Sequence, residues 1–441
     1  MRQAVILCGG KGTRLGAGFS HLPKPLVPVE GIPLLDRILG VAAEAGIKEV
    51  ILAAGHLGHL IAERYQEVNP WGLDIRTHVE KTPLGTAGCL LEIAGQLDEH
   101  FALLYGDIFL DFDLGGLIRR HEAFLPDATV LVRQSDHPAD SDLVDVDMDT
   151  GEVKAFLPKA TRDPAGLYRN CGNAAVYCCS RRLLASVPQG RPSDIATDVF
   201  PALLAEGGRI RAHWLEDTGY VKDMGTPARL VEVERYWRRR QLARASAAAP
   251  RKVRAVILDR DGVIVENREP LAETAHMTFL PGALEGLRLM NENGLACFVA
   301  TNQPWIARGL LTEEQMAAVH GQLVAAVNQA GGGIRAIAHS PYHPETHHGE
   351  GVPALRRASE CRKPRPGMLF ALMEEHGFLP DETVMVGDSP ADITAGKNAG
   401  VRTVLIRPAN GAGSPDTTAP MADATVEDLQ SAAAVIRAWS R

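Results

Sequence analysis

The chain has 441 residues, of which 45% are hydrophobic and 23% are charged. This composition is typical of a globular protein with ample core-forming material, and the length favours two or three domains. The formal net charge of −8 argues against non-specific binding to nucleic acid or to an anionic membrane. No apolar run approaches the length of a membrane-spanning helix, so we expect neither kind of partner.

The cysteines and the start of the chain predict a location. There are seven cysteines, an odd number without framework-like spacing, which favours a reducing compartment over a disulfide scaffold. The first apolar run begins at residue 4, so we expect no signal peptide. We therefore expect a cytoplasmic protein, whose oligomeric state the sequence leaves open.

Short apolar runs alternate with amphipathic stretches along the chain. The first half predicts strands at residues 4–7, 50–54, 102–105, 129–133 and 174–178. The second half predicts them at residues 255–258, 296–300, 334–338, 383–386 and 403–406. This alternation predicts two α/β domains, each a mainly parallel sheet wound with helices, with ligands at the carboxyl ends of the strands.

The segment 237–254 interrupts this pattern. An Arg-rich helix end runs into residues 245–250, which are small, non-periodic and end at a proline. We predict domains at 1–236 and 253–441, joined by a linker at 237–252. The stretch 408–420, rich in Gly, Pro, Asp and Thr, predicts a loop before a last helix.

A glycine-rich segment at residues 7–16 follows the first expected strand. Its glycines allow a sharp bend that exposes successive N–H groups to phosphate oxygens: Gly9, Gly10 and Gly12. Arg14 adds a fork-shaped cation suited to a polyphosphate, and Lys24, flanked by prolines, adds another. The segment is neither a Walker A loop nor a dinucleotide fingerprint.

Together with later elements, this loop resembles the sugar-1-phosphate nucleotidyltransferase family over about the first 235 residues. The matching elements are the Gly-Gly-x-Gly-Thr-Arg-Leu loop, Lys24-Pro25, the Pro-Leu-Gly-Thr-Ala-Gly run at 83–88, Gly106-Asp107, Asn173-Ala174 and Asp-Met-Gly-Thr-Pro at 223–227. In that family a sugar phosphate attacks the α-phosphorus of a nucleoside triphosphate, and pyrophosphate leaves.

The resemblance also implies roles for residues. Asp107 and Asp223 would hold Mg²⁺, a pairing that suits a divalent ion bridging anionic oxygens. Arg14 and Lys24 take catalytic roles, and Lys159 and Asn173 contact the sugar phosphate. The nucleotide would lie against Leu7, Gly9, Gly10, Gly12, Thr13, Glu80 and Gly85.

Glu80, just before the run at 83–88, bears on which base is held. A carboxylate can accept hydrogen bonds from both the ring N–H and the exocyclic amine of guanine, whereas uracil and thymine match an amide better. The run at 83–88 also looks like guanylyltransferases for mannose- or heptose-1-phosphate. The alternative is that Glu80 is a solvated charge at a strand end.

One departure from the family affects the sugar. Relatives usually have a Glu-Lys pair after a phenylalanine, where the acid contacts sugar hydroxyls. Here Phe156 is followed by leucine, Pro158 and Lys159, so the lysine is kept and the acid is replaced by proline. The resemblance therefore does not fix the sugar.

The second half opens with Asp259-Arg260-Asp261-Gly262 after an expected strand. One aspartate can attack phosphorus, while the other protonates the departing alkoxide and then activates water. Further elements follow later strands: Thr301-Asn302, Lys363, and Gly387-Asp388 with Asp392. A hydroxyl and an ammonium neutralise a phosphoryl group, and the late aspartates hold Mg²⁺.

This ordered set resembles the haloacid-dehalogenase-like phosphatases over residues 253–407, without a large cap. The resemblance implies catalytic roles for Asp259 and Asp261, Mg²⁺ at these two and Asp388, and phosphate binding by Thr301, Asn302 and Lys363. Within the family, the motifs look like the branch of heptose-1,7-bisphosphate and histidinol-phosphate phosphatases. Arg362 is there a natural clamp for a second phosphate.

That branch normally carries a zinc loop, Cys-x-His followed by Cys-x-Cys. This chain has Ser340-x-Tyr342 and Ser359-x-Cys361 instead. One thiolate cannot make a tetrahedral zinc site, and the histidines of the loop (His343, His347 and His348) are more typical of a polar loop. We predict Mg²⁺ in both domains and no zinc.

The two resemblances favour a bifunctional enzyme of GDP-D-glycero-α-D-manno-heptose synthesis, with GTP and heptose phosphates as small-molecule substrates. One half would remove the 7-phosphate of heptose 1,7-bisphosphate, and the other would transfer GMP to heptose 1-phosphate. The alternative is a mannose-1-phosphate guanylyltransferase, or another sugar-1-phosphate nucleotidyltransferase, fused to a phosphatase of different specificity such as histidinol-phosphate phosphatase. A third reading, in which one half is a regulatory binding module, is disfavoured because the acidic residues of both motif sets are present.

Overall fold

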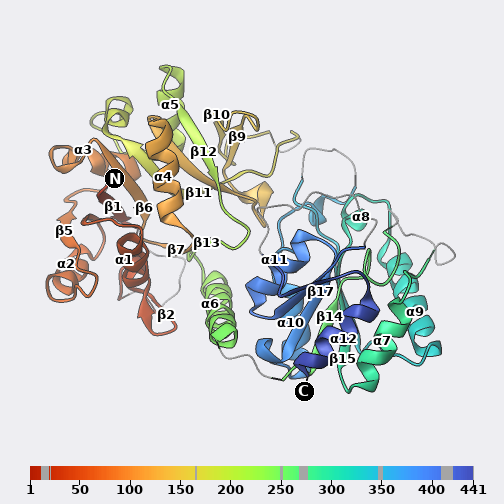
Figure 1. Cartoon of the computed structure of the whole chain (residues 1–441). Helices are drawn as coiled ribbons and strands as arrows, with labels where there is room; N and C mark the ends of the chain where they lie inside the picture. Colours follow the sequence, from red (N-terminus) through yellow and green to blue (C-terminus); the bar gives the residue numbers. More distant parts are fainter. Residues whose placement is uncertain are drawn as a thin grey trace. The chain divides into compact units, whose positions relative to one another are not determined.

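The computed structural model describes residues 1–10, 19, 21–163, 166–248, 252–267, 277–345, 351–408 and 421–440. The chain forms two compact units, Met1–Tyr236 and Trp237–Arg441 (Figure 1). Each unit is an α/β domain, as the alternation of strands and helices predicts. Most of the segment predicted as a linker, up to Ala248, is the C-terminal part of helix α6 (Pro227–Ala248). Within the second unit, Arg239 of this helix pairs with Glu374 at 2.7 Å.

The first unit is built on a nine-stranded sheet. Its order is β10-β9-β11-β6-β1-β4-β5, with β8 paired to β11 and β12 paired to β8. The strands are β1 (Gln3–Cys8), β4 (Glu49–Ala54), β5 (Asp74–Val79), β6 (His100–Tyr105), β8 (Ala128–Arg133), β9 (Leu143–Val146), β10 (Val153–Leu157), β11 (Gly172–Ser180) and β12 (Ile210–Trp214). Strands β6, β1, β4 and β5 are parallel, whereas β11 runs antiparallel to β6 and β8.

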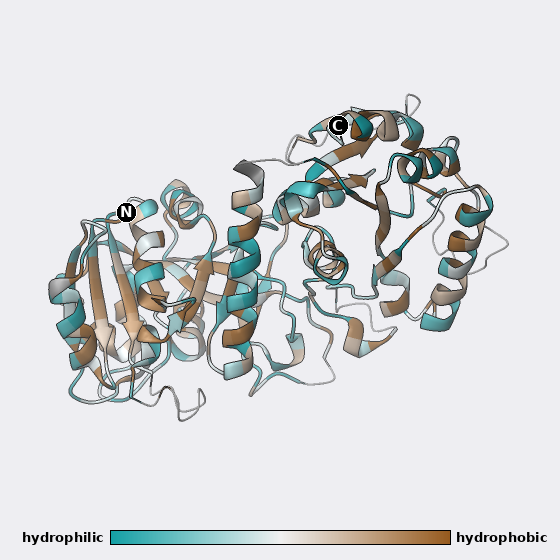
Figure 2. Cartoon of the chain, turned by 90° about the horizontal axis from the view of Figure 1, so that it is seen from below, coloured by the Kyte–Doolittle hydropathy of each residue, from teal (hydrophilic) through white to brown (hydrophobic). Residues whose placement is uncertain are grey.

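Shorter elements complete this unit. Two small antiparallel pairs join β2 (Pro28–Val29) to β3 (Ile32–Pro33) and β7 (Ile108–Asp111) to β13 (Tyr220–Asp223). The helices are α1 (Leu34–Glu44), α2 (Gly58–Glu67), α3 (Gly85–Glu92), α4 (Leu114–Phe124), α5 (Phe200–Ala205) and the start of α6. All six residues of β1 are buried, as expected of a central parallel strand with both faces covered. Figure 2 shows the strands as strongly apolar segments among helices of mixed polarity.

The second unit has a fully parallel sheet in the order β16-β15-β14-β17-β18-β19. The strands are β14 (Ala255–Leu258), β15 (Ala296–Asn302), β16 (Ala336–Ser340), β17 (Thr383–Gly387), β18 (Arg402–Ile406) and β19 (Ala424–Val426). The helices are α7 (Ala283–Glu292), α8 (Pro304–Ala307), α9 (Glu313–Gln329), α10 (Gly367–His376), α11 (Pro390–Ala399) and α12 (Leu429–Trp439). The predicted loop at 408–420 lies, after its first residue, outside the described residues.

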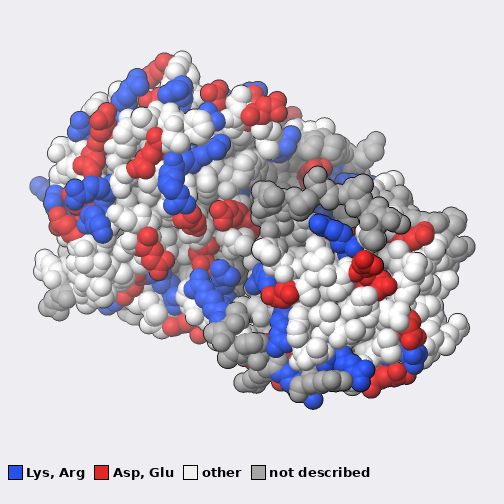
Figure 3. Space-filling model, viewed as in Figure 1, with Lys and Arg blue, Asp and Glu red and all other residues white. Residues whose placement is uncertain are grey.

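The surface carries charges of both signs. Among the described residues on the face drawn in Figure 3, Lys and Arg side chains are interspersed with Asp and Glu. Such mixing gives no broad field of one sign on this face. None of the described helices has both the length and the apolar character that a membrane span requires.

Two helical glycines of the second unit provide a matched test of its packing. A Cβ at Gly286 of α7 would lie 2.7 Å from the backbone of Leu429, whereas a Cβ at Gly321 of α9 would meet nothing within 4 Å. We expect Gly286→Ala to destabilise the unit by about 1–3 kcal/mol through overpacking. Gly321→Ala should stabilise it by about 0.5–1 kcal/mol, because glycine loses more backbone entropy in a helix. Calorimetric melting of the full chain measures both, and shifts of the same sign would contradict the close approach of α7 to Leu429.

Candidate active sites in the two units

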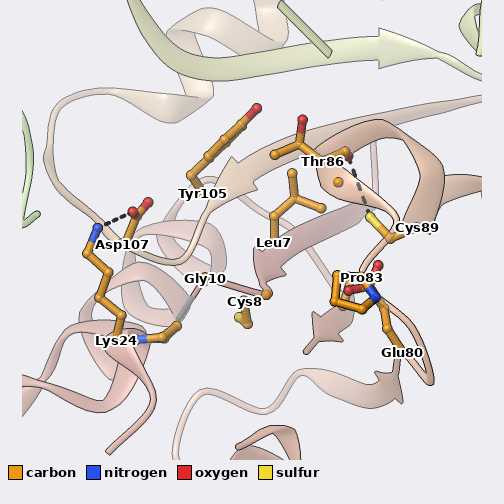
Figure 4. A pocket seen from close by; sticks show the side chains of 14 residues that line it. Leu7, Cys8, Gly10, Lys24, Glu80, Pro83, Thr86, Cys89, Tyr105 and Asp107 are labelled. Atoms are coloured by element: carbon orange, nitrogen blue, oxygen red, sulfur yellow. Dashed lines mark hydrogen bonds and ion pairs between the residues drawn. The ribbon is translucent and has the colours of Figure 1, made fainter. Parts of the chain in front are cut away.

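The first unit contains a pocket of about 310 Å³ at the carboxyl ends of β1 and β6 (Figure 4). This is the edge at which a parallel sheet gathers ligands. Seven residues predicted from the sequence line it: Leu7, Gly9, Gly10, Lys24, Glu80, Gly85 and Asp107. Gly12, Thr13 and Arg14 lie outside the described residues, so their roles stay predictions.

A cation and a carboxylate face each other in this pocket. The Lys24 ammonium is buried and forms an ion pair with Asp107 (Figure 4). The backbone brings Asp223 close to Asp107, because Asp223 lies opposite Ile108 in the β7–β13 pair and the Met224 N–H donates to the Asp107 carbonyl at 2.9 Å. The Asp223 carboxylate is itself paired with Arg229. These two carboxylates are hard oxygen donors of the kind that Mg²⁺ prefers.

Glu80 stands on another wall of the pocket, after β5. Its Oε1 atom is buried and has no hydrogen-bond partner among the described residues. Burial, and then the neighbouring Glu92 carboxylate, raise the pKa of Glu80. A buried acceptor without a donor is costly, so this oxygen is placed to receive hydrogen bonds from a ligand.

The turn that leads into α3 depends on glycine. Gly85 has a φ of +77°, and a Cβ at this position would lie 2.3 Å from the Ser193 carbonyl oxygen. The Ala87 N–H donates to the same oxygen at 3.0 Å, and the Thr86 hydroxyl donates to Asp194 at 2.7 Å. Backbone and side-chain hydrogen bonds therefore fix the run at 83–88 to the loop at residues 193–194.

Lys159 and Asn173, predicted to contact the sugar phosphate, are both described but are not among the residues that line this pocket. The Lys159 ammonium pairs with Asp140 at 2.7 Å and is half exposed. Asn173 donates to the Tyr177 hydroxyl at 2.9 Å, and the Tyr177 ring packs edge-on against Tyr105, which does line the pocket. Asn173 thus contacts the pocket wall through two tyrosines.

The second unit contains a pocket of about 240 Å³ at the carboxyl ends of β14, β15 and β17. Seven predicted residues line it: Asp259, Asp261, Thr301, Asn302, Arg362, Lys363 and Asp388. Asn302 joins two of its walls, since its amide exchanges hydrogen bonds of 2.9 and 3.0 Å with the backbone of Lys363.

A buried lysine lies at the centre of this pocket. Lys363 is 2% exposed, and its ammonium lies 3.0 Å from Asp259 and 2.5 Å from the fully buried Asp392. Burial alone would lower the pKa of Lys363, but the Asp259 and Asp392 carboxylates outweigh burial and raise it. The other oxygen of Asp392 accepts hydrogen bonds from Ser389. Asp392 therefore holds Lys363 as a cation beside Asp259.

Three carboxylates of this pocket meet the geometry of a metal site. Oxygen atoms of Asp259, Asp388 and Asp392 lie within 4.8 Å of one another. Oxygen donors of this kind suit Mg²⁺. Burial, and then Asp392, raise the pKa of Asp388 to about 6. The Asp261 carboxylate, predicted as a metal ligand, is turned toward Arg260 and Gln303 instead, at 2.9 and 2.8 Å.

The position of the Asp388 carboxylate in this cluster depends on glycine at position 262. Gly262 has a φ of +78°, and a Cβ there would lie 1.9 Å from Oδ2 of Asp388. Any side chain would displace Asp388, so the last residue of the Asp-Arg-Asp-Gly motif is required sterically as well as for its backbone conformation.

The segment where related sequences carry a zinc loop is held by other contacts. The Cys361 thiol lies 3.0 Å from the Ser359 hydroxyl and 3.5 Å from the Ser340 hydroxyl, so three of the four positions compared with the zinc loop lie together. The Arg362 guanidinium, one residue on, donates to the Tyr342 carbonyl at 3.1 Å. His347 and His348 lie outside the described residues.

Several pocket residues were not singled out from the sequence. In the first unit they include Cys89 and Tyr105, and in the second Asn267 and Ser389. Trp305 also lines the second pocket. Of these residues, Ser389 carried a usable signal, because it directly follows the predicted Gly387-Asp388 motif at a strand end.

The fold and these pockets define a nucleotidyltransferase-like unit followed by a hydrolase-like unit. The family model described as Nucleotidyl transferase matches residues 3–239, and the chain therefore belongs to this family. A model described as HAD-hydrolase-like matches residues 360–432, which lie within the second unit.

Relatives and solved structures resemble each half separately. Mannose-1-phosphate guanylyltransferase of Mycobacterium tuberculosis is 36% identical over 231 residues, 52% of this chain and 62% of that protein. Mannose-1-phosphate guanyltransferase beta-A of Xenopus laevis is 31% identical over 229 residues, 51% of this chain and 61% of that protein. The chain thus spans less than two thirds of the length of either relative.

Two solved structures are also similar. HddC from Yersinia pseudotuberculosis has a TM-score of 0.46 at 23% identity, covering 54% of this chain and 100% of that one. The D,D-heptose 1,7-bisphosphate phosphatase from B. bronchiseptica, complexed with magnesium and phosphate, has a TM-score of 0.37 at 28% identity, covering 42% of this chain and 98% of that one.

The raised pKa of Asp388 predicts how metal binding depends on pH. With a pKa of about 6, this carboxyl is protonated below pH 6 and cannot serve as a ligand. Burial also raises the pKa of Asp259, the other proposed ligand, to about 7. We therefore expect the Mg²⁺ affinity of the second unit to fall as the pH drops through 7, and to fall by more than about tenfold per pH unit below 6, where both carboxyls are protonated. Calorimetric titration of the full chain with Mg²⁺ between pH 5 and 8 measures this. Asp388→Asn is the control and should bind weakly throughout; equal affinity of the unaltered chain at pH 5 and 7.5 would contradict the prediction.

Proposed function

We propose that the chain is a bifunctional enzyme of GDP-heptose synthesis. Its second unit removes the 7-phosphate of D-glycero-α-D-manno-heptose 1,7-bisphosphate, and its first unit transfers GMP from GTP to the resulting 1-phosphate, releasing pyrophosphate. The observation that carries the proposal is that each unit has a pocket lined by seven of the residues predicted from its motifs, and that the first pocket holds a buried acceptor suited to guanine. The fusion of the two units on one chain fits two consecutive reactions, because the product of one site would be the substrate of the other.

Guanine recognition is supported by the Glu80 carboxylate. The buried Oε1 atom can accept from the ring N–H or the exocyclic amine of the base, and the second oxygen from the other donor. The mannose-1-phosphate guanylyltransferase that is 36% identical to this chain is named for the same nucleotide.

In the transfer step, the chain's own residues bind and orient phosphates. The backbone of Gly9 and Gly10 and the Lys24 ammonium line the side of the pocket that receives the triphosphate. An oxygen of the sugar phosphate attacks the α-phosphorus, and the bond to the pyrophosphate oxygen breaks. Mg²⁺, held by Asp107 and Asp223, would neutralise charge on the phosphates.

In the hydrolytic step, Asp259 is the nucleophile and Asp261 the acid and base. Lys363 lies 3.0 Å from Asp259, where its charge can stabilise the transferring phosphoryl group. Thr301 lines the same pocket and offers a hydroxyl to a phosphate oxygen. Mg²⁺, held by Asp259 and Asp388, would offset the negative charge of the phosphate and of these acids.

Arg362 supports a substrate with two phosphates. Its guanidinium lines the second pocket beside Lys363, and burial, then the charge of Arg308, lower its pKa. A guanidinium that is partly desolvated near the like charge of Arg308 is unfavourable unless an anion pairs with it. A second phosphate of the sugar is such an anion. Arginine suits it, because the planar guanidinium can donate two parallel hydrogen bonds to the oxygens of one phosphate.

The second candidate is mannose-1-phosphate guanylylation in the first unit, with a phosphatase of another specificity. The names of the relatives that are 36% and 31% identical favour it. Pro158 stands where an acid contacts sugar hydroxyls in relatives, so this position does not distinguish heptose 1-phosphate from mannose 1-phosphate. The sugar is therefore decided by experiment.

One assay separates the two candidates. The full chain is incubated with heptose 1,7-bisphosphate, Mg²⁺ and each nucleoside triphosphate in turn, and in parallel with mannose 1-phosphate, and nucleotide sugars are identified by mass. We expect GDP-heptose with GTP. Formation of GDP-mannose alone would establish the second candidate, and no nucleotide sugar with any triphosphate would contradict both.

Replacing Glu80 should change the choice of base. Glu80→Gln puts an amide N–H₂ where the carboxylate accepts, so we expect kcat/KM for GTP to fall about 10- to 100-fold, the range for a hydrogen bond to a charged group. The loss with UTP should be smaller. Glu92→Gln, which removes the carboxylate that pairs with His78, is the matched control and should keep the preference. Equal losses for GTP and UTP in Glu80→Gln would show that Glu80 does not read the base.

A further inference from the structure

The second pocket contains an arginine to which the hydrolytic step assigns no role. Arg260 stands between Asp259 and Asp261 in the sequence, lines the pocket, and is only 1% exposed. A buried guanidinium is unfavourable unless it is paired and hydrogen-bonded. Its partners therefore indicate what it does.

One edge of the guanidinium holds the Asp261 carboxylate at two points. Nε of Arg260 lies 3.1 Å from Oδ1 of Asp261, and Nη2 lies 2.9 Å from Oδ2. A fork of this kind fixes the plane of a carboxylate as well as its position. Gln303 adds a third bond, from Nε2 to Oδ2 at 2.8 Å. Both oxygens of Asp261 are thus oriented by donors.

The opposite edge of the guanidinium is fixed by helix α9. Nη1 lies 3.2 Å from the sulfur of Met316 and 3.3 Å from Nε2 of His320. Because arginine can only donate, Nε2 of His320 is the acceptor and the ring is neutral. Burial, and then the charge of Arg260, lower the pKa of His320 to about 3, so the ring stays neutral at pH 7. Arg260 is therefore held between α9 and Asp261.

We propose that Arg260 is a positioning residue that aims the Asp261 carboxyl at the leaving group of a phosphomonoester. The inference rests on the proposed phosphatase activity of the second unit. In that reaction an Asp259 oxygen bonds to phosphorus, the bond from phosphorus to the alkoxide oxygen breaks, and the Asp261 proton passes to that oxygen. Water then attacks the phosphorus of the aspartyl phosphate, its proton returns to Asp261, and phosphate leaves as Asp259 is released.

The leaving group distinguishes this role from a structural one. An alkoxide must be protonated as it departs, whereas p-nitrophenolate leaves readily without a proton. Loss of aim at Asp261 therefore slows phosphoryl transfer from an alkyl phosphate selectively. Loss of packing around Arg260 slows transfer from both kinds of ester equally.

The test compares benzyl phosphate with p-nitrophenyl phosphate, two esters of similar size, on the full chain. The quantity is kcat/KM, which reports phosphoryl transfer to Asp259 and not the later hydrolysis. In Arg260→Met we expect a loss of about 10- to 100-fold with benzyl phosphate, a part of what general acid catalysis contributes, and less than about threefold with p-nitrophenyl phosphate. Arg260→Lys keeps the charge but not the fork and should show the same selectivity.

Two further variants complete the design. Arg288→Met, which removes a surface arginine of α7 that pairs with Glu285 and Glu292, is the control and should change neither rate. In an Asp261→Asn background, Arg260→Met should cause no further selective loss, because the two residues act as a unit. Equal losses for the two esters in Arg260→Lys would overturn the proposal. Failure of the unaltered chain to hydrolyse either ester would instead refute the phosphatase function.

Discussion

Each site is organised around a buried lysine whose charge is balanced by aspartates from other segments. Lys24 pairs with Asp107 in the first unit, and Lys363 pairs with Asp259 and Asp392 in the second. A buried ammonium is unfavourable unless it is paired, so these contacts tie the segments of each pocket to one another. They also keep a positive charge at the wall of each pocket, where the proposed function needs a phosphate to be neutralised. In the second unit the pairing is reinforced by Ser389, which holds Asp392, and by Asn302, which holds the backbone of Lys363.

The parallel sheets put these pairs where they are needed. In both units the chain leaves a central buried strand, β1 or β14, directly into the segment that carries the first motif. Later strands add one or two groups each at the same edge, so residues a hundred or more positions apart share one pocket. The steric demands are local: at Gly85 and Gly262 a side chain would collide with Ser193 or Asp388. The two pockets are thus built in the same way, at the carboxyl ends of parallel strands and with a buried lysine paired with aspartate.

Much of this arrangement follows from the sequence, because a motif that ends an apolar strand must reach the carboxyl edge of a parallel sheet. For that reason Leu7, Asp107 and Asp259, which end or follow expected strands, line the two pockets. Three features do not follow. The antiparallel direction of β11 depends on long-range pairing with β6 and β8. The turn of Asp261 toward Arg260 depends on α9, which no local pattern connects to the motif. The convergence of Ser340, Ser359 and Cys361 depends on a loop whose expected metal ligands are missing.

We propose that the two sites act in sequence on one sugar phosphate, and a single variant tests this proposal directly. Asp259→Asn removes the proposed nucleophile of the second unit and leaves every described residue of the first pocket intact. Nucleotide-sugar formation by this variant is measured with GTP and Mg²⁺, once with heptose 1,7-bisphosphate and once with heptose 1-phosphate. We expect no product from the bisphosphate and an unchanged rate from the monophosphate. Formation of a nucleotide sugar from the bisphosphate at the rate of the unaltered chain would contradict it.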